Sequence, residues 1–178
     1  MNRRIATAVE STSARHRRVD REIVDALENA GINFCASVPC GLLGGVLQLI
    51  TRSKAFTHIP VTREEEGVGL CAGAYLGGAR PALLMQNSGL GNSVNALLSL
   101  TGLYEMGLLL LISYRGRRGE EQIEAQMPMG SATTSILHIL QAKYTVIERE
   151  RDIEMVRTAA EQSHDGITAV LLTPRVWK

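Results

Sequence analysis

Residues 82–112 read ALLMQNSGLGNSVNALLSLTGLYEMGLLLLI, and this stretch decides the fold. It begins and ends with uninterrupted apolar runs, at residues 82–85 and 108–112. Runs of this kind are typical of strands that are buried on both faces of a sheet. Residues 91–100 carry a helical pattern, so the stretch predicts a strand, a helix and a second strand. A unit of this order closes right-handed and makes its two strands parallel.

The same alternation extends in both directions along the chain. Short apolar runs predict four further strands, at residues 34–38, 58–61, 144–147 and 167–172. Helical spacing of apolar side chains predicts helices at residues 19–30, 43–50, 63–76, 133–140 and 153–162. The sequence therefore predicts one three-layer α/β/α domain over residues 19–178, built around a six-stranded parallel sheet.

Composition and charge exclude several classes of protein. The chain has 178 residues and a formal net charge of +1, with 19 lysines and arginines against 18 acids. No bulk charge therefore recruits nucleic acid or an anionic membrane. The longest apolar run is far shorter than the roughly 20 residues of a membrane-spanning helix. Three cysteines without a CxxC pair indicate reduced thiols in a cytoplasm, and the four histidines are scattered without a nearby nucleophile.

Residues 1–18 differ from the rest of the chain. They contain five arginines and show no apolar periodicity. We interpret this segment as a polar, partly mobile N-terminal arm that is either solvated or in contact with a partner. No apolar run follows Arg3 and Arg4, so we expect no secretory signal.

Ligands of parallel α/β sheets bind at the carboxyl ends of the strands. The candidate site therefore comprises the segments that follow the first four predicted strands: residues 39–41, 62–66, 86–92 and 113–126. Cys40 in the first segment is either a reactive thiol or, more simply, an inert one.

The second segment contains three consecutive glutamates, Glu64, Glu65 and Glu66. Thr62 and Glu65 fit a capping box at a helix start, where acidic residues are also favoured by the helix dipole. Alternatively, a partly desolvated glutamate shares a proton with a ring nitrogen of a ligand. The helix that follows lacks side chains at four positions, which predicts a close neighbour from this chain, a partner subunit or a flat ligand: Gly67, Gly69, Gly73 and Gly77.

The third and fourth segments offer amides, a hydroxyl and cations. Residues 86–92, QNSGLGN, lack the third glycine of a dinucleotide fingerprint, because Val94 stands there. The segment is either a structural turn or a loop that presents Asn87 and Ser88 to a substrate. In the fourth segment one of three arginines could hold a carboxylate, phosphonate or sulfonate, unless all are solvated: Arg115, Arg117 and Arg118.

These segments together resemble the pyrimidine-binding domain of thiamine diphosphate enzymes, and most of all the sulfopyruvate and phosphonopyruvate decarboxylases. The matching residues are SVPC at 37–40, REEEGVGLCAGAYL at 63–76, MQNSGLGNSVN at 85–95, SYRG at 113–116 and EAQ at 124–126. The QNSGLGN run is the most specific of these motifs. The resemblance implies a six-stranded parallel sheet with helices on both sides, in agreement with the periodicity.

The resemblance also implies roles for individual residues. Counting back from Ala74, the family's catalytic glutamate is Glu65, which hydrogen-bonds the aminopyrimidine ring nitrogen of thiamine diphosphate. Pro39 and Asn92 are expected to contact the cofactor as well. Five residues are expected to contact the substrate: Cys40, Asn87, Ser88, Arg115 and Gln126.

Full-length members of the family carry a second domain, which holds Mg2+ and the diphosphate through a Gly-Asp-Gly…Asn motif. This sequence contains no such motif. The resemblance therefore implies the alpha subunit of a two-subunit enzyme. A beta subunit would supply the missing domain, the Mg2+ ligands and half of the cofactor site.

The expected reaction is decarboxylation of 3-sulfopyruvate to sulfoacetaldehyde and CO2. Phosphonopyruvate is the alternative substrate, and a carboligating subunit or a non-catalytic binding or regulatory subunit of the same fold is the alternative function. Three residues depart from the pattern of the family. Gly41 stands where relatives place Ser or Asp, Met85 where some place a catalytic His, and Tyr114 where a Trp is expected. Proton-shuttling groups are therefore expected from the partner or from loops.

Overall fold

The computed structural model describes residues 2–120 and 123–178, with side chains from Ser13 onward. The strands are β1 Phe34–Ser37, β2 Thr57–Pro60, β3 Pro81–Gln86, β4 Leu108–Ser113, β5 Lys143–Ile147 and β6 Ile167–Leu172. They form one sheet in the order β2-β1-β3-β4-β6-β5, and every neighbouring pair is parallel. The predicted six-stranded parallel sheet is confirmed.

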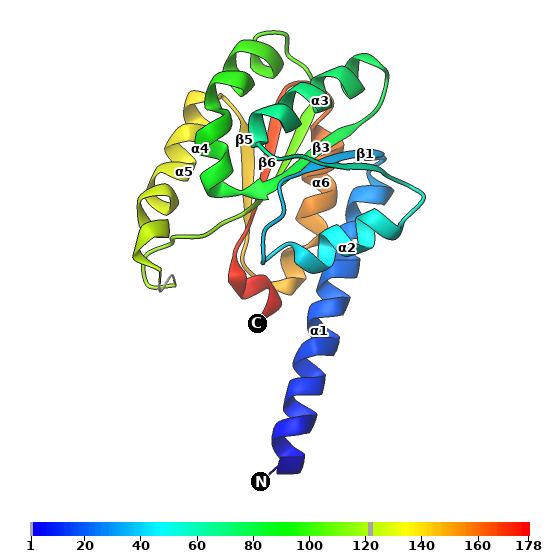
Figure 1. The fold of residues 1–178 in the computed structure, drawn as a ribbon, viewed down its shortest axis with the longest axis vertical. Helices are drawn as coiled ribbons and strands as arrows, with labels where there is room; N and C mark the ends of the chain where they lie inside the picture. Colours follow the sequence, from blue (N-terminus) through cyan, green and yellow to red (C-terminus); the bar gives the residue numbers. More distant parts are fainter. Residues whose placement is uncertain (1, 121–122) are drawn as a thin grey trace.

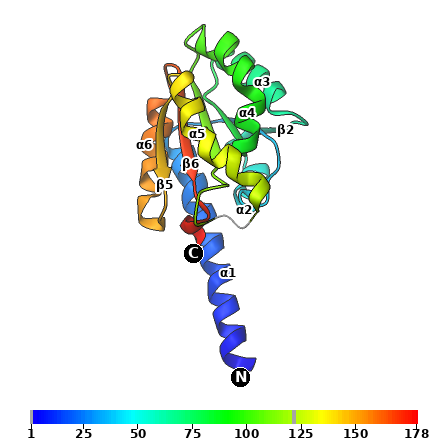
Figure 2. The ribbon, with the colours of Figure 1, turned by 90° about the vertical axis from the view of Figure 1, so that its left-hand side faces the viewer.

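Helices cover both faces of the sheet (Figures 1 and 2). The α-helices are α1 Asn2–Asn29, α2 Gly44–Arg52, α3 Glu64–Leu76, α4 Asn87–Ala96, α5 Met127–Ile139 and α6 Glu154–Gln162. The short helices are η1 Leu97–Gly102, η2 Glu124–Gln126, η3 Glu150–Asp152 and η4 Pro174–Trp177. One layer consists of α1, α2 and α6, and the other of α3, α4 and α5. Across the described residues, no helix is both long and apolar enough to cross a membrane.

The core lies on both faces of the central strands. Every residue of β4 and β6 is buried, as the apolar run at residues 108–112 predicts for β4. Leu109 and Leu111 of β4 pack against the layer of α1, α2 and α6. Leu108 and Leu110 alternate with them and pack against the other layer. Two separate apolar clusters therefore fix the sheet between its helices.

Helix α1 is longer than predicted, because it runs without a break from Asn2 instead of starting at residue 19. Its N-terminal part extends away from the rest of the chain (Figures 1 and 2). Residues 13–18 are exposed, so no buried face imposes apolar periodicity on them. The segment also contains no glycine or proline that would end a helix. The predicted polar arm, residues 1–18, is therefore helical from Asn2 onward.

Helices α4 and α5 also begin earlier than predicted. Helix α4 starts at Asn87, so the predicted turn at residues 86–92 is mostly the first two turns of a helix. Asn, Ser and Gly favour turns locally, and here a buried side-chain contact of Asn87 outweighs that preference. Helix α5 starts at Met127 with Pro128 in its first turn, where the missing N–H of proline has no cost.

Candidate active site

The predicted site residues lie at one end of the sheet, where the strands have their carboxyl ends; we call this end the carboxyl edge. Cys40 follows β1, Glu65 follows β2, Asn87 and Ser88 follow β3, and Arg115 follows β4. These four strands are consecutive in the sheet, in the order β2-β1-β3-β4, and all are parallel. Their carboxyl ends therefore meet at the edge where ligands of such sheets bind.

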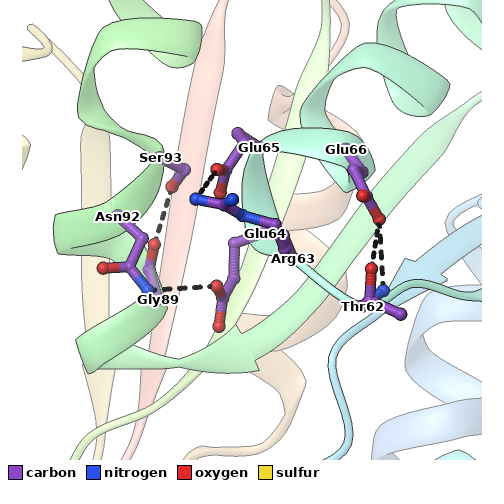
Figure 3. Close-up of polar contacts among 8 residues, drawn as sticks. All are labelled: Thr62, Arg63, Glu64, Glu65, Glu66, Gly89, Asn92 and Ser93. Carbon is purple, nitrogen blue, oxygen red and sulfur yellow. Dashed lines mark hydrogen bonds and ion pairs between the residues drawn. The ribbon is translucent and has the colours of Figure 1, made fainter.

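The three consecutive glutamates at the start of α3 have different surroundings (Figure 3). The carboxylate of Glu66 accepts the backbone N–H of Thr62 at 3.2 Å and its hydroxyl at 2.9 Å. The hydrogen bond from Thr62 lowers the pKa of Glu66. The predicted capping pair of Thr62 with Glu65 is therefore wrong. Helix α3 has Arg63 as its N-cap, which places Glu66 at the third helical position.

Glu64 connects α3 to α4. Its Oε2 accepts a hydrogen bond from Asn92 Nδ2 at 3.3 Å (Figure 3). Its carboxylate also lies so close to Gly89 that a Cβ at that position would overlap it. Asn92, a predicted cofactor contact, therefore lies beside the first turn of α3 but bonds Glu64.

Glu65 has an oxygen without a partner. Its Oε1 forms an ion pair with Arg63 Nη2 at 2.7 Å, while Oε2 is buried and has no hydrogen-bond partner among the described residues. A buried carboxylate oxygen that lacks a donor costs free energy, about 1–3 kcal/mol for a polar group. A donor from a ligand or from another chain would remove that cost. Glu65 is therefore the glutamate that is suited to hold a ring nitrogen.

Asn87 is fully buried and fully paired. Its Nδ2 donates to the carbonyl of Arg115 at 2.9 Å and to Thr133 Oγ1 at 3.0 Å. Its Oδ1 accepts the backbone N–H of Arg115 at 3.1 Å. Asn87, a predicted substrate contact, therefore has no donor left for a substrate. Its side chain instead fixes the backbone of Arg115.

Gln86, the last residue of β3, brings two predicted substrate residues together. Its Nε2 donates to Ser88 Oγ at 3.0 Å and to Gln126 Oε1 at 2.8 Å. Ser88 lies in α4, whereas Gln126 is the last residue of η2 and follows Ser88 by 38 residues in the sequence. Gln86 lies within the candidate segment 86–92 and the QNSGLGN motif, but no role of its own is predicted for it from the sequence. Its position at the carboxyl end of a central strand is the signal that points to it.

The loop after β4 is pressed against the start of α5. Gly116 has a positive φ of 81°, and a Cβ there would overlap the carbonyl of Gln126. The hydroxyl of Tyr114 donates to the carbonyl of Gly130 at 3.0 Å. These contacts fix the backbone of the loop that contains Arg115 against the segment that contains Gln126. Tyr114, the residue that replaces the expected Trp, makes one of these contacts.

The cations of this loop have different surroundings. Arg117 forms ion pairs with Glu148 at 2.6 Å and Glu120 at 3.3 Å, and its guanidinium lies 5.6 Å from the centre of the Tyr114 ring. Arg115 instead lines a cavity of about 490 Å³ together with Gly41. The substrate contact predicted for Arg115 stays a prediction.

A second cavity, of about 590 Å³, lies beside α2 and includes Pro39 and Cys40 in its wall. In this wall Ser37 Oγ lies 2.8 Å from His58 Nε2, and Thr51 Oγ1 lies 2.9 Å from His58 Nδ1. Burial lowers the pKa of His58. This serine–histidine pair is not apparent in the sequence, because 21 residues separate its members.

The cysteines are free thiols in distinct positions. Cys40 Sγ lies 3.3 Å from Ser113 Oγ, which connects the loop after β1 to the end of β4. Cys35 and Cys71 are buried, and burial raises the pKa of Cys71 to about 12. Among the described residues, no group of three or more His, Cys, Asp or Glu side chains could hold a metal ion.

Comparison with known proteins gives the family. The chain is 43% identical over 159 residues to sulfopyruvate decarboxylase subunit alpha of Methanococcus maripaludis, which covers 88% of this chain and 95% of that protein. The chain belongs to the family of sulfopyruvate decarboxylase alpha subunits. The alpha subunit of Methanothermobacter thermautotrophicus is 52% identical over 118 residues, or 66% of this chain and 71% of that protein. No protein-family model matches the chain.

More distant similarities extend beyond the alpha-subunit family. Phosphonopyruvate decarboxylase of Streptomyces viridochromogenes is 31% identical over 131 residues, which cover 74% of this chain but only 33% of that longer protein. Among solved structures, a 2-oxoglutarate:ferredoxin oxidoreductase of Magnetococcus marinus superposes with a TM-score of 0.66 at 14% identity. The match covers 86% of this chain and 28% of the oxidoreductase chain, and it shows a shared fold.

Proposed function

We propose that this chain is the alpha subunit of a two-subunit, thiamine diphosphate-dependent enzyme that decarboxylates 3-sulfopyruvate to sulfoacetaldehyde and CO2. The observation that carries the proposal is the buried, unpartnered Oε2 of Glu65 at the carboxyl edge of the sheet. The reaction and the substrate are inferred from the relatives, which are named sulfopyruvate decarboxylase subunit alpha.

The residues present fit the aminopyrimidine ring of the cofactor. Glu65 Oε2 is the free acceptor, and a carboxyl group there can share a proton with a ring nitrogen. Asn92, expected to contact the cofactor, bonds Glu64 in the same turn of α3, and Pro39 lies in the loop after β1, the strand beside β2. When bound, thiamine diphosphate supplies the electron sink for the loss of CO2. The chain's own part is to hold the ring and to control a proton at Glu65.

The diphosphate and Mg2+ belong to a beta subunit in this proposal. Mg2+ that binds with a diphosphate is usually held by one or two carboxylates and the phosphate oxygens, and the Gly-Asp-Gly…Asn motif of full-length relatives is absent from this sequence. The relatives that carry the name subunit alpha imply a partner subunit. Two thirds of the longer phosphonopyruvate decarboxylase also lie outside the match, which leaves room there for a second domain.

The structure weakens the reading of a non-catalytic subunit. If Glu65 capped α3, stability alone would explain its presence, and a non-catalytic binding subunit would also contain it. Glu66 makes that capping contact, however, so capping does not account for Glu65. Phosphonopyruvate stays the alternative substrate, because it is also a small polyanion, and its decarboxylases are the more distant relatives.

The test is Glu65→Gln in the complex of this chain with the partner that co-purifies with it, assayed as CO2 release from 3-sulfopyruvate. Glutamine keeps the size of the side chain but cannot share the proton, so kcat should fall by about a hundredfold or more. Glu66→Gln is the matched control, because it removes the same charge one residue away. Its kcat should stay within about threefold of the unaltered complex.

Four outcomes would contradict the proposal. An unchanged kcat in the Glu65→Gln complex would remove Glu65 from the mechanism. Release of CO2 without added thiamine diphosphate would remove the cofactor, and release from phosphonopyruvate alone would replace the substrate. A complex that releases CO2 from neither compound would favour the binding subunit.

A further inference from the structure

We propose that Gln86 is a positioning residue that turns the hydrogen-bond donors of Ser88 and Gln126 toward an oxyanion group of the substrate. The inference rests on the proposed function and names the groups that recognise the anion.

The direction of two hydrogen bonds carries the inference. Gln86 Nε2 lies 3.0 Å from Ser88 Oγ and 2.8 Å from Gln126 Oε1. An amide nitrogen has two hydrogens and accepts no hydrogen bond, so Gln86 is the donor in both contacts. Both partner oxygens are therefore acceptors.

The donors of the two partners stay available as a result. The hydroxyl hydrogen of Ser88 points away from Gln86, and Gln126 keeps both hydrogens on its Nε2. Among the described residues, neither group has an acceptor within hydrogen-bond distance. Both side chains are partly exposed. This part of the edge therefore presents donors, and oxyanions form the strongest hydrogen bonds with such donors.

The surroundings also fix the backbone next to one of these donors. Asn87 fixes both backbone groups of Arg115, and Gly116 packs on the carbonyl of Gln126. The side chain of Arg115 lines the cavity that contains Gly41. The acid in that cavity, Glu120, is already paired with Arg117 and Arg175. The loop that carries Arg115 is thus held against Gln126, one of the two donors.

The first test is Gln86→Met in the complex with the partner subunit, since Met has a similar length but donates no hydrogen bond. We expect KM for 3-sulfopyruvate to rise about tenfold and kcat to stay within about threefold. The dissociation constant of sulfoacetate, an unreactive dianion measured by calorimetry, should rise by a similar factor of about ten. Gln162→Met, an exposed position on α6, is the matched control and should change none of these values.

A double-mutant cycle separates positioning from a general structural effect. If Gln86 acts through Gln126, Gln86→Met should add little to a complex that already carries Gln126→Met. The loss of sulfoacetate affinity in the double variant should then be at least about threefold smaller than the product of the single losses. Two independent effects would multiply.

Several results would overturn the inference. These are a Gln86→Met complex with normal sulfoacetate affinity, losses that multiply in the cycle, or an unaltered complex that does not bind sulfoacetate. If the Gln86→Met chain does not assemble, Ser88→Ala and Gln126→Met remove the donors separately, and normal affinity in both would also overturn it. Calorimetry needs no turnover, so a complex that fails the CO2 assay can still confirm or exclude the role of Gln86.

Discussion

Gln86 and Asn87 are adjacent polar residues, yet their side chains differ in burial and in hydrogen-bond partners. Asn87 is completely buried and satisfies its polar atoms within the chain, while Gln86 is partly exposed and holds two other exposed side chains. The chain changes from strand to helix between them, which sends the two side chains in different directions. The structural role of Asn87 and the substrate-binding role proposed for Gln86 are therefore separated within one dipeptide.

Asn87→Ala should lower the free energy of unfolding by about 2–4 kcal/mol, because it removes the hydrogen bonds that a fully buried side chain makes to the backbone of Arg115 and to Thr133. Urea denaturation of the purified chain measures this change. Asn92→Ala is the matched control, since Asn92 is exposed and makes one 3.3 Å contact with Glu64. It should cost less than about 1 kcal/mol. Equal losses for the two variants would contradict the structural role of Asn87.

At the scale of elements, His58 connects β2 to α2. Thr51 Oγ1 donates its hydrogen to the carbonyl of Leu47 at 2.7 Å, so it accepts one from His58 Nδ1. His58 Nε2 is then the acceptor for the hydroxyl of Ser37. This arrangement needs a neutral imidazole, in agreement with the lowered pKa that burial gives His58.

Stability should consequently depend on pH through His58. Its folded-state pKa lies below the ordinary 6.5, so the unfolded chain binds more protons between the two values. The free energy of unfolding should be highest above pH 6.5 and should fall as the pH drops below it. Urea midpoints between about pH 5.5 and 7.5 measure this slope. His58→Gln should flatten it, whereas His164→Gln, at an exposed position, should not; a slope that survives His58→Gln would assign it elsewhere.

Elements were predictable from the sequence where burial dictates the pattern. Strands β4 and β6 are largely apolar because both faces are covered, and the bounds of β6 were predicted correctly while β4 extends one residue further, to Ser113. Helix starts were less predictable, because long-range contacts decide them. Because the side chain of Asn87 makes buried contacts, α4 begins at Asn87, four residues before the start that its apolar spacing predicts. A shift of one residue at the start of α3 likewise moves the capping contact from Glu65 to Glu66.

At the scale of the whole molecule, the glycines of α3 have different surroundings: Gly67 faces the core of this chain, whereas Gly69 and Gly73 face outward. A Cβ on Gly67 would meet Leu83 Cδ1 at 2.5 Å, so this glycine serves packing within the chain. Gly69 and Gly73 have no described atom within 4 Å of that position. Exposed apolar side chains of α3, η1 and the turn after it accompany them: Leu70, Leu76, Leu98, Leu103 and Tyr104. A face of this kind fits a close approach by the proposed beta subunit.

Gly69→Ala and Gly73→Ala should therefore have opposite effects on the chain and on the complex. Alanine favours a helix by about 1 kcal/mol over glycine, so each variant chain should unfold at higher urea. The added methyl groups would obstruct a closely packed subunit and should weaken its association about tenfold or more. Gly67→Ala is the internal control, because it should destabilise the chain itself. If both outward variants bind the beta subunit normally in a titration, that subunit covers another face.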